Sequence, residues 1–235
     1  MGKLEVRDST RPGYFDVHAR KYQETLDSNL ALIGETGEAF VEYRMNYLRR
    51  RLPLLPRRVL DFGCGIGMAI PHLLAAFPGC EVVGVDVSEE SVKVARSRLR
   101  DDRARVTLND DLVADGFDLA YASGVFHHIE SEHRLEAARY IFRALRPGGV
   151  FVLAEHNPWN PVTRLLVRTC AFDEGVQLLR PKVARRLLED AGFNIWCLDF
   201  VGFFAGPLRS LRSIERHLAW SPVGAQYIVL ARREQ

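Results

Sequence analysis

Cysteine, excess charge and long apolar runs are all scarce in this chain. Only four of its 235 residues are cysteine, and no two of them have the C-x-x-C spacing of a metal-binding pair. The formal net charge is +2, too small for the broad basic surface that binds nucleic acid or an anionic membrane. We therefore expect no structural disulfides, no nucleic-acid partner and a reduced, cytoplasmic setting.

The sequence also lacks targeting and repeat signals. Its first residues, MGKLEVRD, have no apolar core of the kind found in a signal peptide. No stretch approaches the roughly 18 apolar residues of a membrane-spanning helix, so no membrane span is expected. Internal repeats and low-complexity segments are missing as well. With 47% hydrophobic and 26% charged residues, the chain has the composition of one globular domain with a sizeable core.

A glycine loop between two short apolar segments is the most informative feature that is present. Residues 59–67 read VLDFGCGIG, in which an apolar strand leads into three glycines. Residues 82–86 read VVGVD, a second apolar strand that ends on the carboxylate of Asp86. This order of strand, glycine turn, helix and strand is the first half of a nucleotide-binding unit. The glycines allow a ligand to approach the backbone, and Asp86 suits the two donor hydroxyls of a ribose.

The spacing of the glycines distinguishes between nucleotide ligands. A dinucleotide fingerprint runs G-x-G-x-x-G, and its third glycine lets the helix pack closely on the strand. Here the run is G-x-G-x-G, and the next residue is the bulky Met68. No lysine follows in the position that a P-loop requires. An NAD(P)-dependent oxidoreductase would share the fold and stays an alternative, although its fingerprint is missing.

Strand and helix signals alternate along the chain. Helices are expected over 14–26, 38–51 and 68–77, from Ser88, from Ser131, from Pro181 to Gly192, and near 208–218. Strands are expected at 59–62, 81–86, 105–109, 117–122, 150–154, 194–200 and 226–231. Strands that alternate with helices predict an α/β fold with a doubly wound, mostly parallel sheet and helices on both faces.

The glycine loop, with Asp61 ahead of it and Asp86 after it, resembles motif I of the class I S-adenosylmethionine (SAM)-dependent methyltransferases. Residues 122–129, ASGVFHHI, and 14–22, YFDVHARKY, are similar to small-molecule members such as the ubiquinone and menaquinone biosynthesis enzymes. The resemblance implies SAM as cofactor and a Rossmann-like sheet of seven strands whose last strand is antiparallel. It implies cofactor contacts from Asp61, Gly63, Cys64, Gly65, Gly67, Asp86, Val87, Asp110, Asp111, Ser123, Gly124, Tyr14 and Tyr22.

Two adjacent histidines, His127 and His128, follow the fourth expected strand. Three roles stay open for them: packing, capping, or acting as a base, since imidazole titrates near neutrality and can take a proton from a substrate hydroxyl. A metal site is not expected. Adjacent residues point apart on a strand or loop, and no third ligand is evident.

The segment after the fifth expected strand, residues 155–161, reads EHNPWNP. Its prolines and asparagines fix a loop where an acceptor would enter. His156 and Glu155 are candidates for a base or for a hydrogen bond to the substrate. Asn157 is a further candidate for binding the substrate, and Trp159 offers a rigid apolar wall. A well-packed turn without a role in the chemistry is the alternative.

These features predict a methyltransferase that moves a methyl group from SAM to a small, partly hydrophobic metabolite, mainly by holding the acceptor in line. Within one domain, residues 1–56 would form a helical lid, 57–155 the SAM-binding core, and 156–235 the substrate-side loop and the rest of the sheet. A regulatory protein that binds SAM without catalysis is a second alternative. The sequence leaves open the acceptor, its reacting atom and the oligomeric state.

Overall fold

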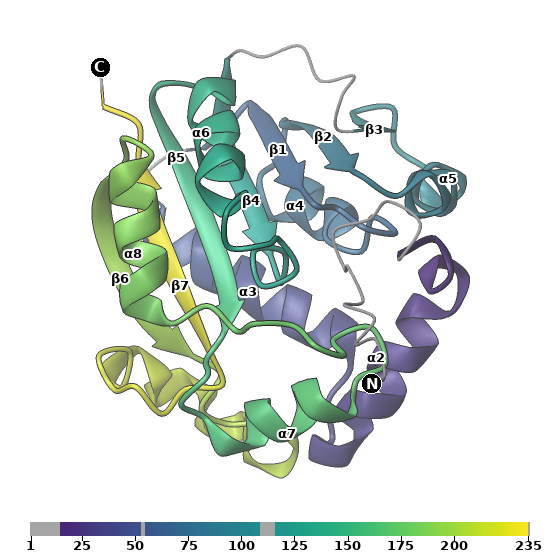
Figure 1. Ribbon diagram of the computed structural model, residues 1–235, viewed down its shortest axis with the longest axis vertical. Coiled ribbons are helices and arrows are strands. Elements are labelled where there is room, and N and C mark those ends of the chain that lie inside the picture. The colour runs from purple at the N-terminus through teal and green to yellow at the C-terminus, as the bar shows by residue number, and fades with distance from the viewer. Residues whose placement is uncertain (1–14, 53–54, 109–115, 235) are drawn as a thin grey trace, which may run out of the picture.

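The computed structural model describes residues 15–52, 55–108 and 116–234. They form a seven-stranded sheet in the order β3-β2-β1-β4-β5-β7-β6, with helices on both faces (Figure 1). The strands are β1 (Arg58–Phe62), β2 (Glu81–Asp86), β3 (Ala104–Leu108), β4 (Phe117–Ser123), β5 (Leu145–His156), β6 (Asn194–Val201) and β7 (Gln226–Arg232). Strands β1 to β5 pair in parallel, and β7 runs antiparallel to both β5 and β6. The predicted fold class is confirmed.

Each face of the sheet is covered by its own layer of helices. Successive side chains of a strand point to opposite faces, so Val59 packs in one core cluster and its neighbour Leu60 in the other. One layer holds α3 (Gly37–Arg51), α4 (Ile70–Ala76) and α5 (Glu89–Arg98), and the other holds α6 (Arg134–Ala144) and α8 (Pro181–Asp190) (Figure 1). Because both faces are covered, the central strands are almost wholly apolar.

Two expected element boundaries differ from the structure, while a third agrees. Ser88 Oγ accepts from Ser91 N at 3.0 Å and begins α5 as predicted. The expected cap at Ser131 is wrong, because α6 begins only at Arg134. Strand β5 begins at Leu145, five residues before the predicted start, because the chain already pairs with β4 ahead of an irregularity in the register.

The N-terminal helix predicted over 14–26 is divided into shorter pieces. A 3₁₀ turn, η1 (Ala19–Lys21), precedes α2 (Tyr22–Leu30), which continues into the 3₁₀ turn η2 (Ala31–Ile33). Gly34 then reverses the chain with a φ of 69°, and α3 follows. No helix in the described parts of the chain is long and apolar enough to cross a membrane.

Two further helical segments lie beyond the lower end of the sheet in Figure 1. Helix α7 (Pro161–Thr169) follows the predicted loop and has no counterpart among the expected elements, and Asn160 caps it by accepting from Thr163 N at 2.9 Å. The basic helix expected near 208–218 is a 3₁₀ helix, η4 (Gly206–His217). Its Arg212 turns toward the protein interior, where it pairs at 2.7 Å with the fully buried side chain of Glu35.

Candidate active site

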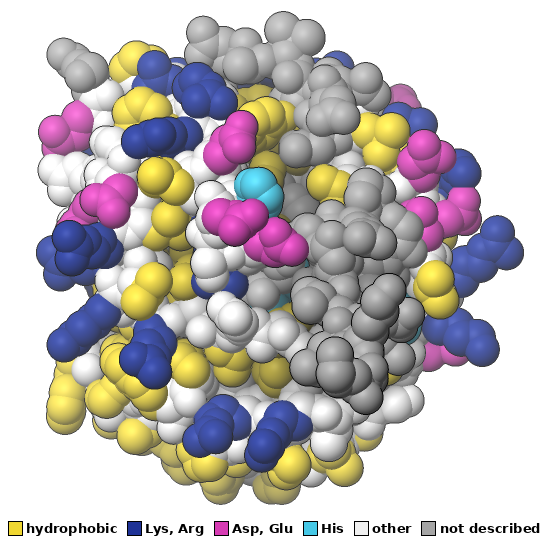
Figure 2. Space-filling view, viewed as in Figure 1, with side chains coloured by type: hydrophobic (Ala, Val, Ile, Leu, Met, Phe, Trp, Pro, Cys, Tyr) yellow, Lys and Arg dark blue, Asp and Glu magenta, His cyan; other side chains and the backbone are white. Residues whose placement is uncertain are grey.

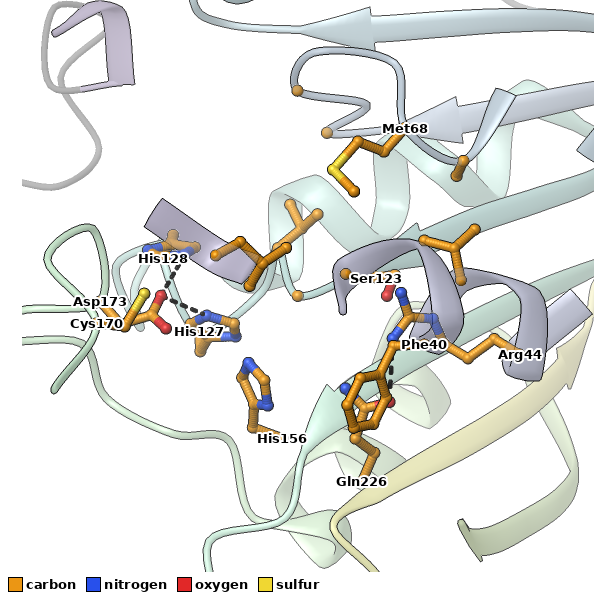
Figure 3. Close-up of a pocket in the computed structure, with 18 of the residues that line it drawn as sticks. Phe40, Arg44, Met68, Ser123, His127, His128, His156, Cys170, Asp173 and Gln226 are labelled. Carbon is orange, nitrogen blue, oxygen red and sulfur yellow. Dashed lines mark hydrogen bonds and ion pairs between the residues drawn. The ribbon is translucent and has the colours of Figure 1, made fainter. Parts of the chain in front are cut away.

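A cavity of about 850 Å³ opens at the carboxyl ends of β1, β2, β4 and β5. It lies where the strand order reverses between β1 and β4, which is the position where open α/β sheets bind ligands. Strand-end residues form one wall, and residues of α2, α3, α7 and η4 form the other (Figure 3). Its size and mixed lining are those of a site for small molecules.

The glycine loop forms part of the strand-side wall. Gly63 N and Cys64 N both donate to Val85 O, at 2.9 and 3.0 Å, which ties the loop to the end of β2. Gly65 has a φ of 53°, and a Cβ atom placed on it would meet nothing within 4 Å. The backbone is therefore open to a ligand at this point. Gly63 serves packing instead, because a Cβ there would lie 2.5 Å from Val125.

Asp86 holds the same loop from the end of β2. Its Oδ2 accepts from Gly65 N at 2.8 Å, and its Oδ1 accepts from Ser88 N at 2.9 Å. Burial raises the pKa of the Asp86 carboxyl, and these amide hydrogen bonds partly offset that rise. Each oxygen keeps a further lone pair, so the carboxylate can still accept from two ligand hydroxyls. The neighbouring Val87 lines the same cavity.

Asp61 supplies a second carboxylate to the cavity, with one oxygen that has no partner. It is 3% exposed, and its Oδ2 is buried without a hydrogen bond from any described residue. Burial, reinforced by the charge of Asp86, raises the pKa of Asp61 to about 7. An orphaned, buried carboxylate oxygen fits a cationic ligand group such as the ammonium of SAM, so the residues present suit that cofactor.

Arg44 of α3 brings a buried positive charge to the cavity. Its Nε donates to Tyr121 Oη at 2.9 Å and one terminal nitrogen donates to Gln226 Oε1 at 3.1 Å (Figure 3). In the described portion of the chain, no carboxylate forms an ion pair with it. A buried guanidinium held only by neutral acceptors favours an anionic ligand group. Sequence reasoning missed Arg44, because nothing in the pattern of α3 separates it from surface arginines.

Two histidines meet Asp173 at the far side of the cavity, and a third, His156, lies beside them (Figure 3). His127 Nδ1 lies 2.6 Å from Glu155 Oε2, and His127 Nε2 lies 3.6 Å from Asp173 Oδ1. His128 Nε2 lies 3.2 Å from the same Asp173 oxygen. The ring of His156 is centred 5.1 Å from that of His127. Asp173, which follows α7, was not predicted as a site residue.

The electrostatics of this cluster separate the histidines. Burial alone would lower the pKa of His127, but the carboxylates of Glu155 and Asp173 outweigh it and raise the pKa to about 10. His156 differs, since burial and the nearby charge of His127 lower its pKa to about 4. The pKa of His128 is also lowered, mainly by burial. At neutral pH the cluster therefore holds a protonated His127 beside a neutral His156.

The other residues predicted for substrate binding lie behind the cavity wall or on the surface. Glu155 is fully buried and accepts from Phe126 N at 2.8 Å as well as facing His127. Asn157 is fully buried and ties the β5 end to the carbonyl of Gly224 at 2.7 Å. Trp159 is 48% exposed and packs beside Phe200. None of the three lines the cavity, because their hydrogen bonds and packing direct them to the scaffold.

The remaining predicted cofactor residues fall into three groups. Ser123, Gly124, Cys64 and Tyr22 line the cavity, and Tyr22 stacks on Phe172 with ring centres 4.5 Å apart. Gly67 does not, since it faces α5 and a Cβ there would lie 3.2 Å from Ala95. The third group lies outside the described residues and comprises Tyr14, Asp110 and Asp111.

The sheet order, the glycine loop and the acidic end of β2 define a Rossmann-like methyltransferase fold. Residues 60–151 match a family model described as a methyltransferase domain. A crystal structure of an S-adenosylmethionine-dependent methyltransferase from Mesorhizobium loti is 27% identical, with a TM-score of 0.58 over 80% of this chain and 96% of that one. Residues 60–151 are therefore similar to a methyltransferase domain, and the fold is that of the class I methyltransferases, whose methyl donor is SAM.

Two curated relatives show how far the similarity extends. A trans-aconitate 2-methyltransferase from Rhodopseudomonas palustris is 30% identical over 120 residues, 51% of this chain and 46% of that protein. A carboxy-S-adenosyl-L-methionine synthase from Aeromonas hydrophila is 28% identical over 187 residues, 67% of this chain and 75% of that protein. This chain thus spans about half the length of the first relative and three quarters of the second.

Proposed function

We propose that this protein transfers a methyl group from SAM to a small, partly hydrophobic acceptor bound in the same cavity. The observation that carries the proposal is one continuous cavity with Gly65, Asp86 and Asp61 on one side and the histidine cluster on the other. When bound, SAM supplies a methyl group that is already electrophilic. The protein then has to bind the acceptor, orient it and exclude water. Such positioning can contribute about 7–11 kcal/mol.

The charged groups of the cavity suit the two ends of the cofactor. We propose that Asp86 accepts from the ribose hydroxyls beside the open backbone of Gly65. Asp61 would accept from the ammonium of the amino-acid portion, and Arg44 would donate to its carboxylate. Burial and the charge of Asp86 raise the pKa of Asp61, and the charge of Arg44 offsets part of that rise. Arg44 and Asp61 are therefore close enough to interact. Opposite charges facing one ligand match a zwitterion.

The cavity is mainly apolar. Its lining includes Leu26, Phe40, Leu166, Phe203 and Leu208. Apolar side chains also gather on the lower part of the surface in Figure 2, where Figure 1 places α7. An acceptor with a hydrophobic body would bury this lining on binding. This supports the resemblance to enzymes that methylate ring-bearing quinone precursors.

Helices α2 and α3 would act as the N-terminal lid that the sequence predicts. Tyr22 and Leu26 of α2 and Phe40 of α3 line the cavity opposite the strand ends. These contacts support a lid over both ligands, with the SAM-binding core of residues 57–155 beneath it. A lid of this kind keeps water from the reacting groups.

We propose that His156 orients the acceptor by hydrogen bonding and is not a strong base. Its pKa of about 4 keeps the imidazole neutral at physiological pH, but gives little driving force for taking a proton from a hydroxyl. His127 is already protonated between two carboxylates. The histidines would therefore contribute mainly to positioning, unless another group lowers the pKa of the acceptor.

The experiment that tests the proposal is a methyl-transfer screen. The purified protein would be incubated with SAM carrying a deuterated methyl group and a metabolite extract, and the products analysed by mass spectrometry. A labelled metabolite that forms with wild-type protein, but not with a folded Asp86→Ala variant, is the expected result. Tight SAM binding with no labelled product from any extract would instead favour the non-catalytic, SAM-binding alternative.

A further inference from the structure

Three metal-ligand side chains converge at the acceptor end of the cavity. One ring nitrogen from each of His127 and His128 and one oxygen of Asp173 all lie within 4.8 Å of one another. Figure 3 shows both imidazoles directed at the same carboxylate. We propose that His127, His128 and Asp173 form a binding site for a divalent transition-metal ion of the zinc class.

The separations match what one ion would require. Zinc binds imidazole nitrogen and carboxylate oxygen at about 2.0–2.2 Å, so neighbouring ligands of a tetrahedral site lie about 3.3–3.5 Å apart. Asp173 Oδ1 lies 3.6 Å from His127 Nε2 and 3.2 Å from His128 Nε2. The first distance lies just above that range and the second just below it. An ion could therefore enter between the carboxylate and the imidazoles with small rotations of the rings, and its binding would displace the proton from His127 Nε2 into solvent.

A second carboxylate orients the first histidine. Glu155 Oε2 lies 2.6 Å from His127 Nδ1, and Glu155 Oε1 accepts from Phe126 N at 2.8 Å. With Nδ1 occupied by Glu155, Nε2 is the atom left to face Asp173. Histidine ligands of metal sites generally donate their other ring nitrogen to a carboxylate in this way, which fixes the ring and strengthens the ligand.

The local backbone explains why adjacent histidines can act together. Residues 126–128 form a turn in which His128 N donates to Val125 O at 3.0 Å. In a turn of this kind, neighbouring side chains do not point to opposite sides as they do on a strand. The third ligand comes from a distant segment, where Asp173 N donates to Cys170 O at 3.1 Å. The expectation that two adjacent histidines point apart therefore does not hold in this turn.

The proposed ion would face the acceptor. All three ligands line the cavity, and three protein ligands leave one tetrahedral position for water or substrate, as in catalytic zinc sites. Bound there, an acceptor hydroxyl would have a lowered pKa and lose its proton to water. Its oxygen would then form a bond to the SAM methyl carbon while the carbon–sulfur bond breaks and the thioether leaves. This role rests on the proposed function, whereas binding of the ion does not.

Calorimetric titration of zinc into chelator-treated protein tests the site. Asp173→Asn and His128→Gln each remove one ligand with little change in volume. His133→Gln is the matched control, because exposed His133 lies with Glu130 and Glu132 in the other described group that could hold an ion. Thermal melting checks that each variant is folded. SAM is titrated into the same samples. A loss of zinc binding with SAM binding intact concerns this site alone, whereas a loss of SAM binding concerns the proposed function.

We expect wild type and His133→Gln to bind one zinc ion, and Asp173→Asn and His128→Gln to bind it more than 100-fold more weakly. That loss exceeds the roughly 10–100-fold effect typical of residues that only orient a ligand. Should the ligand variants fail to fold, cobalt added to wild type should give the absorption of a tetrahedral nitrogen and oxygen site. The proposal is overturned if wild type binds no zinc, if binding disappears in His133→Gln alone, or if cobalt keeps its aqueous spectrum.

Discussion

Replacing Asp61 with asparagine should stabilise the ligand-free protein and weaken its binding of SAM. Burial, and then the charge of Asp86, raises the pKa of Asp61 from 3.8 to about 7. A carboxyl with a raised pKa favours the folded state most at low pH, and this stability is lost as pH rises from about 4 to about 7. At higher pH the ionised group costs at most about 4 kcal/mol, since each pKa unit is worth about 1.36 kcal/mol.

The asparagine variant removes this cost without changing the size of the side chain. Urea denaturation without ligand should show Asp61→Asn to be more stable than wild type at pH 8, by up to about 4 kcal/mol, and nearly equal to it close to pH 4. SAM binding at pH 8 should change in the opposite direction. Loss of one charge-assisted hydrogen bond, worth about 1.5–3 kcal/mol, corresponds to affinity lower by about 10- to 150-fold.

A pH series separates the charge of Asp61 from other effects. Calorimetry should show the SAM affinity of wild type falling below about pH 7, with a slope that approaches tenfold per unit, because the bound state requires the ionised carboxylate. The asparagine variant should lack this component. If Asp61→Asn bound SAM as tightly as wild type at pH 8, with the same dependence on pH, the assignment of Asp61 to the ligand's ammonium would be refuted.

Three further predictions follow from the cavity. Gly65→Ala should lower the melting temperature by only a few degrees, because alanine is strained at a φ of 53°, yet it should bind SAM at least tenfold more weakly because its Cβ meets only ligand space. Gly63→Ala should destabilise the fold further through contact with Val125 at 2.5 Å, and melting and calorimetry compare the two variants. Arg44→Leu should weaken SAM binding by about 10- to 150-fold, and equal affinity by calorimetry would remove it from the site. His156→Ala should spare SAM affinity and lower kcat by an amount nearly independent of pH above 6, and a loss that shrinks as pH rises would identify a base instead.

The sheet and the side of the cavity that holds the glycine loop were predictable because their signals are local. Short apolar strands, the glycine loop and Asp86 at the end of β2 lie within 28 residues of sequence, from 59 to 86. Parallel strands bring their carboxyl ends to one edge, which fixes where Asp61 and Asp86 meet. Predicting that part of the site did not require knowing which distant segments of the chain contact one another.

The acceptor side was not predictable in the same way. Asp173 reaches His127 and His128 only because α7 and its exit turn fold back over the cavity, and no element was predicted where α7 lies. Its signals were present in the cap at Asn160 and the proline at the first helical position. Buried charges such as Arg44 carry no local pattern, because burial depends on which helix face the tertiary fold covers.

The most direct test of the central claim is calorimetric titration of SAM into wild-type protein and an Asp86→Ala variant. The account places SAM over the glycine loop, with its ribose hydroxyls on the carboxylate that also holds Gly65 N at 2.8 Å. We predict one bound SAM per wild-type chain and affinity at least tenfold lower in the variant, with a cooperative melting transition retained. Unchanged SAM affinity in the folded Asp86→Ala variant, or no SAM binding by wild type, would contradict the account.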